Sequence, residues 1–252
     1  MNAWDEAEGE PMDLKCFSTA ADYIPPHCYE LCGQQFDLSL TGKNAAHYNL
    51  TVSFSEFPSR ELIAAGEMLD SGTYTYDCIK AYDGAYQISF RYLNTCIFIV
   101  LETDNTLAYL IAATAADEVS YETFTGTFDG NAVPEAIKPT EILVGNTVNW
   151  TFGENKVARV KFSKNKSIVT ADFNYNMYQI SDAPCIVYPV NDEVFFQCLC
   201  LNSDRSQWLL MALSNFNNMI GTGVMFGIVK GEVTYKVFGS YGKFISYSEE
   251  KA

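Results

Sequence analysis

Apolar and polar residues alternate with a period of two through most of the chain after residue 34. In 36–41 and 48–54, every second residue is apolar and the residues between are polar. Because successive side chains of a strand point to opposite faces, this pattern predicts strands with one buried face. The same pattern predicts further strands at 73–78, 85–93, 96–101, 107–113, 121–128, 148–152, 157–162, 168–173, 177–182, 193–201, 208–213, 223–229 and 232–238.

The predicted strands follow one another at short spacing, with turn-forming residues between them. Asp83-Gly84 and Asp104-Asn105 suit tight reversals of the chain. Many short antiparallel strands in series are typical of a meander that closes into a barrel. Helix signals are few: 61–69 (ELIAAGEML) fits either a short helix or an irregular strand, and 13–26 allows a short helical piece.

Landmarks in the first half of the chain recur in the second half at a nearly constant offset. The offset is 112 residues for Leu31-Cys32-Gly33 and Leu143-Val144-Gly145, 108 for Phe54 and Phe162, and 107 for Cys78-Ile79 and Cys185-Ile186. Shared offsets over several landmarks indicate an internal duplication. The predicted domains are an N-terminal extension (1–30), a first barrel (31–130), a linker (131–140) and a second barrel (141–245).

Charge and composition narrow the functional classes. The chain has 31 acidic and 16 basic residues, a formal net charge of −15. Binding to nucleic acid or to an anionic membrane requires an excess of Lys and Arg, so neither partner is expected. The acidic start lacks the basic region of a signal peptide, and no apolar run reaches the ~18 residues of a membrane span. The sequence therefore predicts an acidic cytoplasmic protein whose cysteines are reduced.

Motifs for metals and cofactors are absent at the usual spacings. His27 lies beside Cys28 and Cys32, but this spacing does not match common zinc modules and no second cysteine pair supports it. The Gly221-x-Gly223-x3-Gly227 run lacks the strand–turn–helix context of a phosphate-binding loop, and strand glycines that allow curvature explain it better. We therefore expect no metal and no cofactor.

Tyrosines near one strand form the candidate site. Regular alternation over 73–78 would place Tyr74, Tyr76 and Cys78 on one face, and an eight-stranded barrel can leave room for one small ligand. A tyrosine lining offers an apolar wall with hydroxyls that orient or protonate a ligand. We take Tyr76, Asp77 and Tyr86 as candidate catalytic residues. The candidate ligand-binding residues are Tyr74, Tyr82, Arg91, Tyr109, Tyr178, Asp182 and Tyr188.

A short series of motifs resembles the MoaF family over about residues 13–245. It consists of Asp22-Tyr23-Ile24-Pro25-Pro26, then Leu31-x-Gly33, then Leu143-x-Gly145. The resemblance implies an all-β fold of two tandem antiparallel lipocalin-like (calycin) β-barrels. Related calycin barrels include phenolic acid decarboxylases, in which tyrosines and a carboxylate act on a phenolic acid. The chain departs from the family's second barrel, where an aromatic-Glu-His segment precedes Trp-Gln-Cys. Only Phe196-Gln197-Cys198 is similar, so no catalytic residue is carried over.

Three functions fit these observations. The first is a binding protein that holds a small apolar or aromatic metabolite in a barrel; we expect the site in the first barrel, with the second as the alternative. The second is a cofactor-independent lyase or isomerase that uses Tyr76, Tyr86 and Asp77 for proton transfer. The third is a structural or interaction protein with filled barrels, for example a homodimer, whose exposed aromatic residues such as Trp208 and Phe216 contact a partner.

Overall fold

The protein is described by a computed structural model. It covers residues 23–130, 137–164, 166–173, 176–203, 206–229 and 231–246, and it leaves the side chains of 170–182, 202–206 and 246 undescribed. The described part contains sixteen β-strands and no α-helix. None of its segments forms a helix with the length and apolar character needed to cross a membrane. The all-β prediction is confirmed, and the helical alternative for 61–69 is wrong because 61–66 is a strand.

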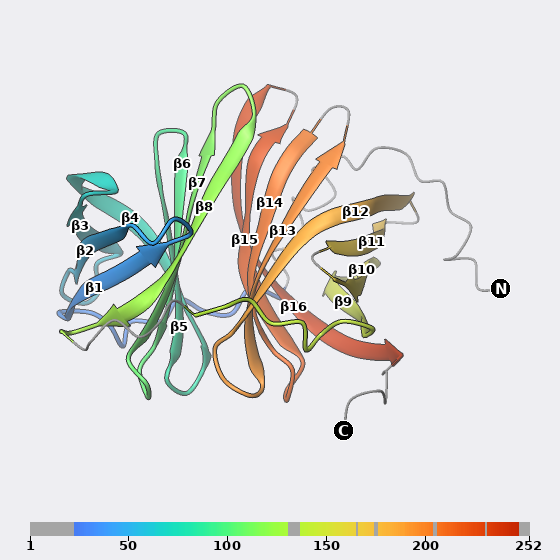
Figure 1. The fold of residues 1–252 in the computed structure, drawn as a ribbon, viewed down its shortest axis with the longest axis horizontal. Coiled ribbons are helices and arrows are strands. Elements are labelled where there is room, and N and C mark those ends of the chain that lie inside the picture. Colours follow the sequence, from blue (N-terminus) through green and yellow to red (C-terminus); the bar gives the residue numbers. More distant parts are fainter. Residues whose placement is uncertain are drawn as a thin grey trace. The chain divides into compact units, whose positions relative to one another are not determined.

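The first eight strands form a closed antiparallel barrel (blue to green in Figure 1). Each strand pairs with the next, and β8 pairs with β1 to close the barrel. Alternation buries one face of most strands, as in β1, where Phe36, Leu38 and Leu40 are buried. The strands are β1 (Gln35–Gly42), β2 (His47–Phe54), β3 (Glu61–Gly66), β4 (Leu69–Tyr82), β5 (Ala85–Tyr92), β6 (Thr95–Glu102), β7 (Leu107–Ala115) and β8 (Val119–Phe128).

The last eight strands form a second closed antiparallel barrel of the same order (yellow to red in Figure 1). Here β16 pairs with β9 to close the barrel. Two tandem antiparallel barrels were predicted, and the structure confirms them. The strands are β9 (Thr147–Gly153), β10 (Lys156–Ser163), β11 (Lys166–Phe173), β12 (Asn176–Pro189), β13 (Val194–Ser203), β14 (Ser206–Asn215), β15 (Ile220–Val229) and β16 (Glu232–Ser246).

The chain divides into two compact units. One spans Pro26–Lys138, and the other combines Pro139–Ala252 with Met1–Pro25. In the second unit, the ring of Tyr23 packs edge-on against Tyr241 of β16, with 5.1 Å between ring centroids. The segment that follows Pro25 belongs to the first barrel, since the N–H of Cys28 donates to the carbonyl of Cys78 at 2.8 Å.

The two barrels begin with the same backbone hydrogen bonds, which supports the internal repeat. Gly33 and Gly145 both have positive φ (74° and 90°), a conformation that glycine adopts without strain. The N–H of Gly33 donates to the carbonyl of Phe54 at 3.2 Å, and that of Gly145 to Phe162 at 3.0 Å. In both copies the same phenylalanine donates its N–H to the residue after the glycine, at 2.9 and 3.0 Å. These two landmarks of the sequence repeat therefore coincide in the structure.

The third landmark, Cys78 and Cys185, does not coincide. Followed strand by strand from β1 and β9, the ladders match Cys78 with Val187 and Tyr76 with Cys185. The cause is the length of the hairpins: Ser167 of β11 pairs with Ala183, 16 residues later, whereas its counterpart Leu62 of β3 pairs with Tyr74, 12 residues later. The match of Cys78 with Cys185 by their sequence offset is thus accidental, because the two residues do not occupy the same position in the two barrels.

Candidate functional site

Aromatic side chains of the predicted tyrosine strand fill the interior of the first barrel. Tyr74, Tyr76 and Cys78 share the inner face of β4 and are 7%, 1% and 0% exposed. The ring of Tyr74 stacks on Phe90 with 5.0 Å between centroids, and Tyr76 packs edge-on against Phe54 at 5.1 Å. These rings act as core side chains, with hydrophobic contacts on several sides.

The structure does not bring the three candidate catalytic residues together. Asp77 lies between two inward tyrosine and cysteine positions, so its side chain points to the outer face of β4. Tyr86 points inward, and its hydroxyl donates to Glu30 Oε2 at 2.8 Å. Tyr76 instead lies with its hydroxyl 3.9 Å from Cys32 Sγ. Asp77 therefore cannot share an interior substrate with either tyrosine in this fold.

Three further candidates of the first barrel also lie outside its interior. Arg91 is exposed on the outer face of β5, where its Nε donates to the carbonyl of Leu93 at 2.8 Å. Tyr82 donates its hydroxyl to Glu102 Oε1 at 3.4 Å near the end of β4. Tyr109 lies on the outer face of β7, because its neighbours Ala108 and Leu110 point into the barrel. Burial raises the pKa of its phenol.

Among the candidates of the second barrel, Tyr188 lies on the outer face of β12. Its inward neighbours include Val187, and its ring stacks on that of Phe196 with 6.2 Å between centroids. The side chains of Tyr178 and Asp182 lie outside the described residues.

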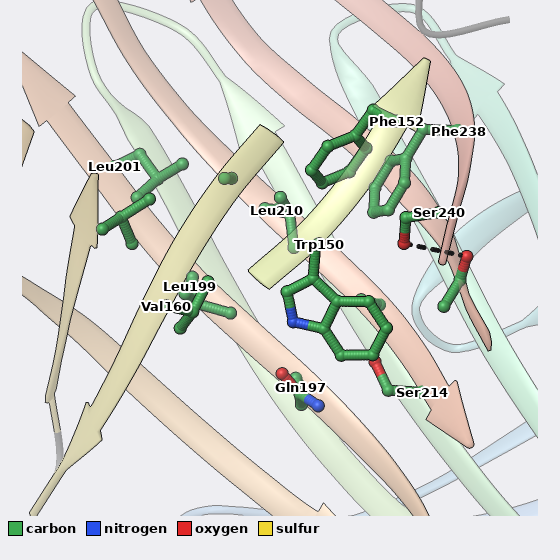
Figure 2. A pocket seen from close by; sticks show the side chains of 14 residues that line it. Trp150, Phe152, Val160, Gln197, Leu199, Leu201, Leu210, Ser214, Phe238 and Ser240 are labelled. Carbon is green, nitrogen blue, oxygen red and sulfur yellow. Dashed lines mark hydrogen bonds between the residues drawn. The ribbon is translucent and has the colours of Figure 1, made fainter. Parts of the chain in front are cut away.

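The interior of the second barrel contains a cavity that the sequence analysis did not predict (Figure 2). The space open to the centres of water-sized molecules is about 40 Å³. This equals roughly three positions of one such molecule each. The lining residues are Trp150, Phe152, Ala158, Val160, Val169, Gln197, Leu199, Leu201, Leu210, Ala212, Ser214, Gly221, Phe238 and Ser240.

Smaller side chains explain why the space opens in the second barrel. The ladders match Ala212, which pairs with Gln197, to Ile99, which pairs with Ile88. They match Ser214, the partner of Phe195, to Leu101, the partner of Tyr86. Ala158 corresponds to Leu50, Leu199 to Phe90, and Ala183 and Cys185 of β12 to Tyr74 and Tyr76. The tyrosines that marked the first barrel as a site are thus the side chains that occupy its space.

Two changes in the opposite direction give the cavity an aromatic wall. Trp150 takes the position of Leu38, and Phe152 that of Leu40. The indole of Trp150 fits beside Gly221, because a Cβ there would lie 3.2 Å from the ring atom Cζ3. The same Cβ would lie 2.7 Å from Ser240 Oγ, so glycine keeps this part of the cavity open.

Three polar side chains lie around the indole of Trp150: those of Gln197, Ser214 and Ser240, each less than 5% exposed (Figure 2). The apolar side chains of Leu201, Leu199 and Val160 lie on another side of the cavity. The hydroxyl of Ser240 donates to the carbonyl of Gly221 at 3.2 Å.

Among the polar residues that line the cavity, Gln197 is the one with an unsatisfied polar atom in the described structure. It is 3% exposed, and its buried Nε2 has no hydrogen-bond partner among the described residues. An unpaired buried donor costs about 1–3 kcal/mol, so its retention calls for an explanation. The first barrel has Ile88 at this position, which shows that the barrel fold itself does not require an amide there. Gln197 is therefore the strongest candidate binding residue of the cavity.

None of the described lining residues is ionisable. Lys156 of β10 is a buried basic residue of the same barrel, at 5% exposed, but it does not line the cavity. Within the described part of the chain, no group of three or more His, Cys, Asp and Glu side chains is arranged to hold a metal ion. The cavity therefore offers apolar contact and hydrogen bonds, without charge.

The polar lining carried a signal in the sequence. Residues 195, 197 and 199 lie on one face of a strand, and two of them, Phe195 and Leu199, are apolar. Alternation therefore predicts that the side chain of Gln197 points inward with them. Its environment depends on small residues from four other strands, and that part of the site follows only from their registers. No protein-family model and no curated protein matches the chain.

Proposed function

We propose that the protein binds one small, neutral, mostly apolar molecule in the second barrel. The observation that carries the proposal is the buried, unpartnered Nε2 of Gln197 at the wall of an apolar cavity. Ligand pockets are mainly apolar, with a few polar groups that fix orientation. A ligand with a carbonyl or ether oxygen would accept the hydrogen bond for which Gln197 Nε2 has no partner among the described residues.

The ligand class follows from the lining. Trp150, Phe152 and Phe238 provide flat aromatic contacts that favour a ring. An anion would lose its hydration without gaining a cationic partner, which is strongly unfavourable in an apolar site. We therefore assign the cavity to a neutral aromatic or alicyclic compound with at least one hydrogen-bond acceptor.

Membership of the MoaF family is part of the same proposal. The two tandem eight-stranded barrels and the matching start of each barrel are what the resemblance implies. A proton-transfer function with Tyr76, Asp77 and Tyr86 has no geometric support, because these side chains do not converge.

Three probes of similar size test the proposal by titration with NMR or calorimetric detection. Acetophenone has a ring and an acceptor, cumene has the same shape without the acceptor, and benzoate is charged. We expect acetophenone to bind with a Kd of about 10 µM to 1 mM, the range open to a ligand of this size. Cumene should bind more weakly and benzoate not detectably. If none of the three binds at millimolar concentration, the proposal is wrong.

The variant Gln197→Met should lower the affinity for acetophenone by about 3- to 10-fold, since one hydrogen bond contributes about 0.5–1.5 kcal/mol. Methionine keeps the length of the side chain, so the affinity for cumene should stay the same or rise. The matched control is Gln34→Met, an exposed glutamine of the first barrel. Phenol, a donor, tests the opposite orientation of the Gln197 amide, with Oε1 toward the ligand. Equal losses for acetophenone and cumene would contradict the assigned hydrogen bond.

A further inference from the structure

The segment that precedes the first barrel brings two thiols together against β4. The N–H of Cys28 donates to the carbonyl of Cys78 at 2.8 Å, and the N–H of Cys78 donates to His27 Nδ1 at 3.3 Å. The two side chains are also hydrogen-bonded to each other, thiol to thiol. The single backbone hydrogen bond and the contact between the two thiols place these residues close enough for a disulfide to join them, since bridged Cα atoms lie about 4.4–6.8 Å apart.

The two thiols differ in exposure and in their surroundings. Cys28 is partly exposed, whereas Cys78 is 0% exposed on the inner face of β4. The hydrogen bond from Cys78 is the main cause that lowers the pKa of Cys28 to about 6, helped by a backbone N–H at Glu30 and by Lys80 and opposed by burial. The same hydrogen bond and burial raise the pKa of Cys78. At neutral pH the pair is thus an accessible thiolate beside a protonated, enclosed thiol.

We propose that Cys28 and Cys78 form a peroxide-sensitive dithiol that closes to a disulfide. The Cys28 thiolate attacks one oxygen of a hydroperoxide; the S–O bond forms, the O–O bond breaks, and hydroxide or alkoxide leaves. Cys78 then attacks the sulfenic sulfur; the S–S bond forms, the S–O bond breaks, and water leaves with the thiol proton. The two sulfur atoms lose two electrons, and the peroxide gains them.

Reduction by a small thiol such as glutathione reverses the reaction. Two thiol molecules supply the two electrons and leave as their own disulfide. A reducing compartment would therefore keep the pair open until peroxide rises, as in other transient intracellular disulfides. In the oxidised form, the disulfide between Cys28 and Cys78 would join the segment that begins at Pro26 covalently to β4.

Neighbouring side chains provide the comparison that isolates Cys28. Cys32 lies four residues along the same segment and is also partly exposed, but the hydrogen bond of its sulfur is with the Tyr76 hydroxyl, at 3.9 Å. The ionisable groups that act on the Cys28 sulfur or are influenced by it are Cys78, Glu30, Lys80, Tyr76 and Tyr86. A pair-specific reaction should appear at Cys28 and not at Cys32.

The test treats the reduced full-length protein with a small excess of hydrogen peroxide at pH 7 and maps the peptides without reduction. We expect a peptide linked through Cys28 and Cys78 in wild type and in Cys32→Ser, its loss in Cys28→Ser, and its disappearance with glutathione. Cys28→Ser changes a partly exposed position and should leave the fold intact, while Cys78→Ala tests the buried partner. A link from Cys28 to Cys32, or sulfinic acid at Cys28 with Cys78 unchanged, would overturn the proposal.

A second measurement does not depend on any variant. The rate of alkylation of Cys28 by iodoacetamide should rise with pH through a midpoint near pH 6, because only the thiolate reacts. Because most of Cys28 is already ionised at pH 7, its alkylation rate should change little between pH 7 and pH 9. A midpoint above pH 8 for Cys28 would contradict its proposed role as the attacking thiolate.

Discussion

Replacing Ala212 by isoleucine is expected to lower the affinity for acetophenone by about 5- to 160-fold. The first barrel already has Ile99 at the matching position, so the substitution places in the second barrel the side chain that helps to fill the first. The added atoms would occupy a space of about 40 Å³, and a ligand could enter only by overpacking the interior. Overpacking costs about 1–3 kcal/mol, which corresponds to about 5- to 160-fold in affinity.

Ala212→Ile should remain folded, so that weaker ligand binding can be attributed to the filled cavity and not to unfolding of the barrel. Isoleucine favours strands and fills a void, so the free energy of unfolding should be unchanged or slightly higher. Trp150 and Trp208 both belong to the second barrel, and their fluorescence reports its unfolding, with Trp4 replaced by phenylalanine. Ala116→Ile, an exposed site of the first barrel, is the control for the substitution itself. Full retention of acetophenone binding in Ala212→Ile would show that the ligand site lies elsewhere.

The strands and the barrels could be predicted from the sequence because alternation is a local property. In 50–54 of β2, for example, the apolar residues are buried and the polar residues between them point outward, as alternation alone predicts. The segment 61–69 was ambiguous because its propensities are helical, and pairing with β2 and β4 decided in favour of a strand at 61–66. Tertiary pairing overrode the local preference there.

The location of the cavity could not be predicted in the same way. Whether a barrel is filled depends on the summed volume of inward side chains from all its strands, and the sum requires their registers. Between matched positions the β11–β12 hairpin is four residues longer than the β3–β4 hairpin, so that Tyr76, and not Cys78, corresponds to Cys185. The abundance of tyrosine in β4 was read as a lining for a ligand, although large rings on an inner face also consume the space a ligand would need.

Tyr76 shows the difference between those two roles, and its replacement should have the largest effect on stability. Its ring is 1% exposed and contacts the rings of Phe54 and His27, each with 5.1 Å between centroids. Truncation of a buried aromatic side chain to alanine costs about 3–5 kcal/mol, a large part of the stability of a typical domain. In Tyr76→Ala, amide hydrogen exchange in peptides from β4 to β6 should accelerate by about 100-fold or more. Peptides from the second barrel should exchange as in wild type.

The conservative variant Tyr76→Phe distinguishes packing from chemistry at this residue. The hydroxyl it removes contacts only a weak partner in the described structure, the thiol of Cys32 at 3.9 Å, and burial keeps the phenol protonated by raising its pKa. Phenylalanine retains the ring, so exchange should accelerate by less than about fivefold, equivalent to about 1 kcal/mol. Acetophenone binding should be unchanged in both Tyr76 variants, provided that Tyr76→Ala keeps the second barrel folded. A loss of ligand binding in Tyr76→Phe, with exchange unaltered, would return the functional site to the first barrel and reject the assignment to the cavity beside Gln197.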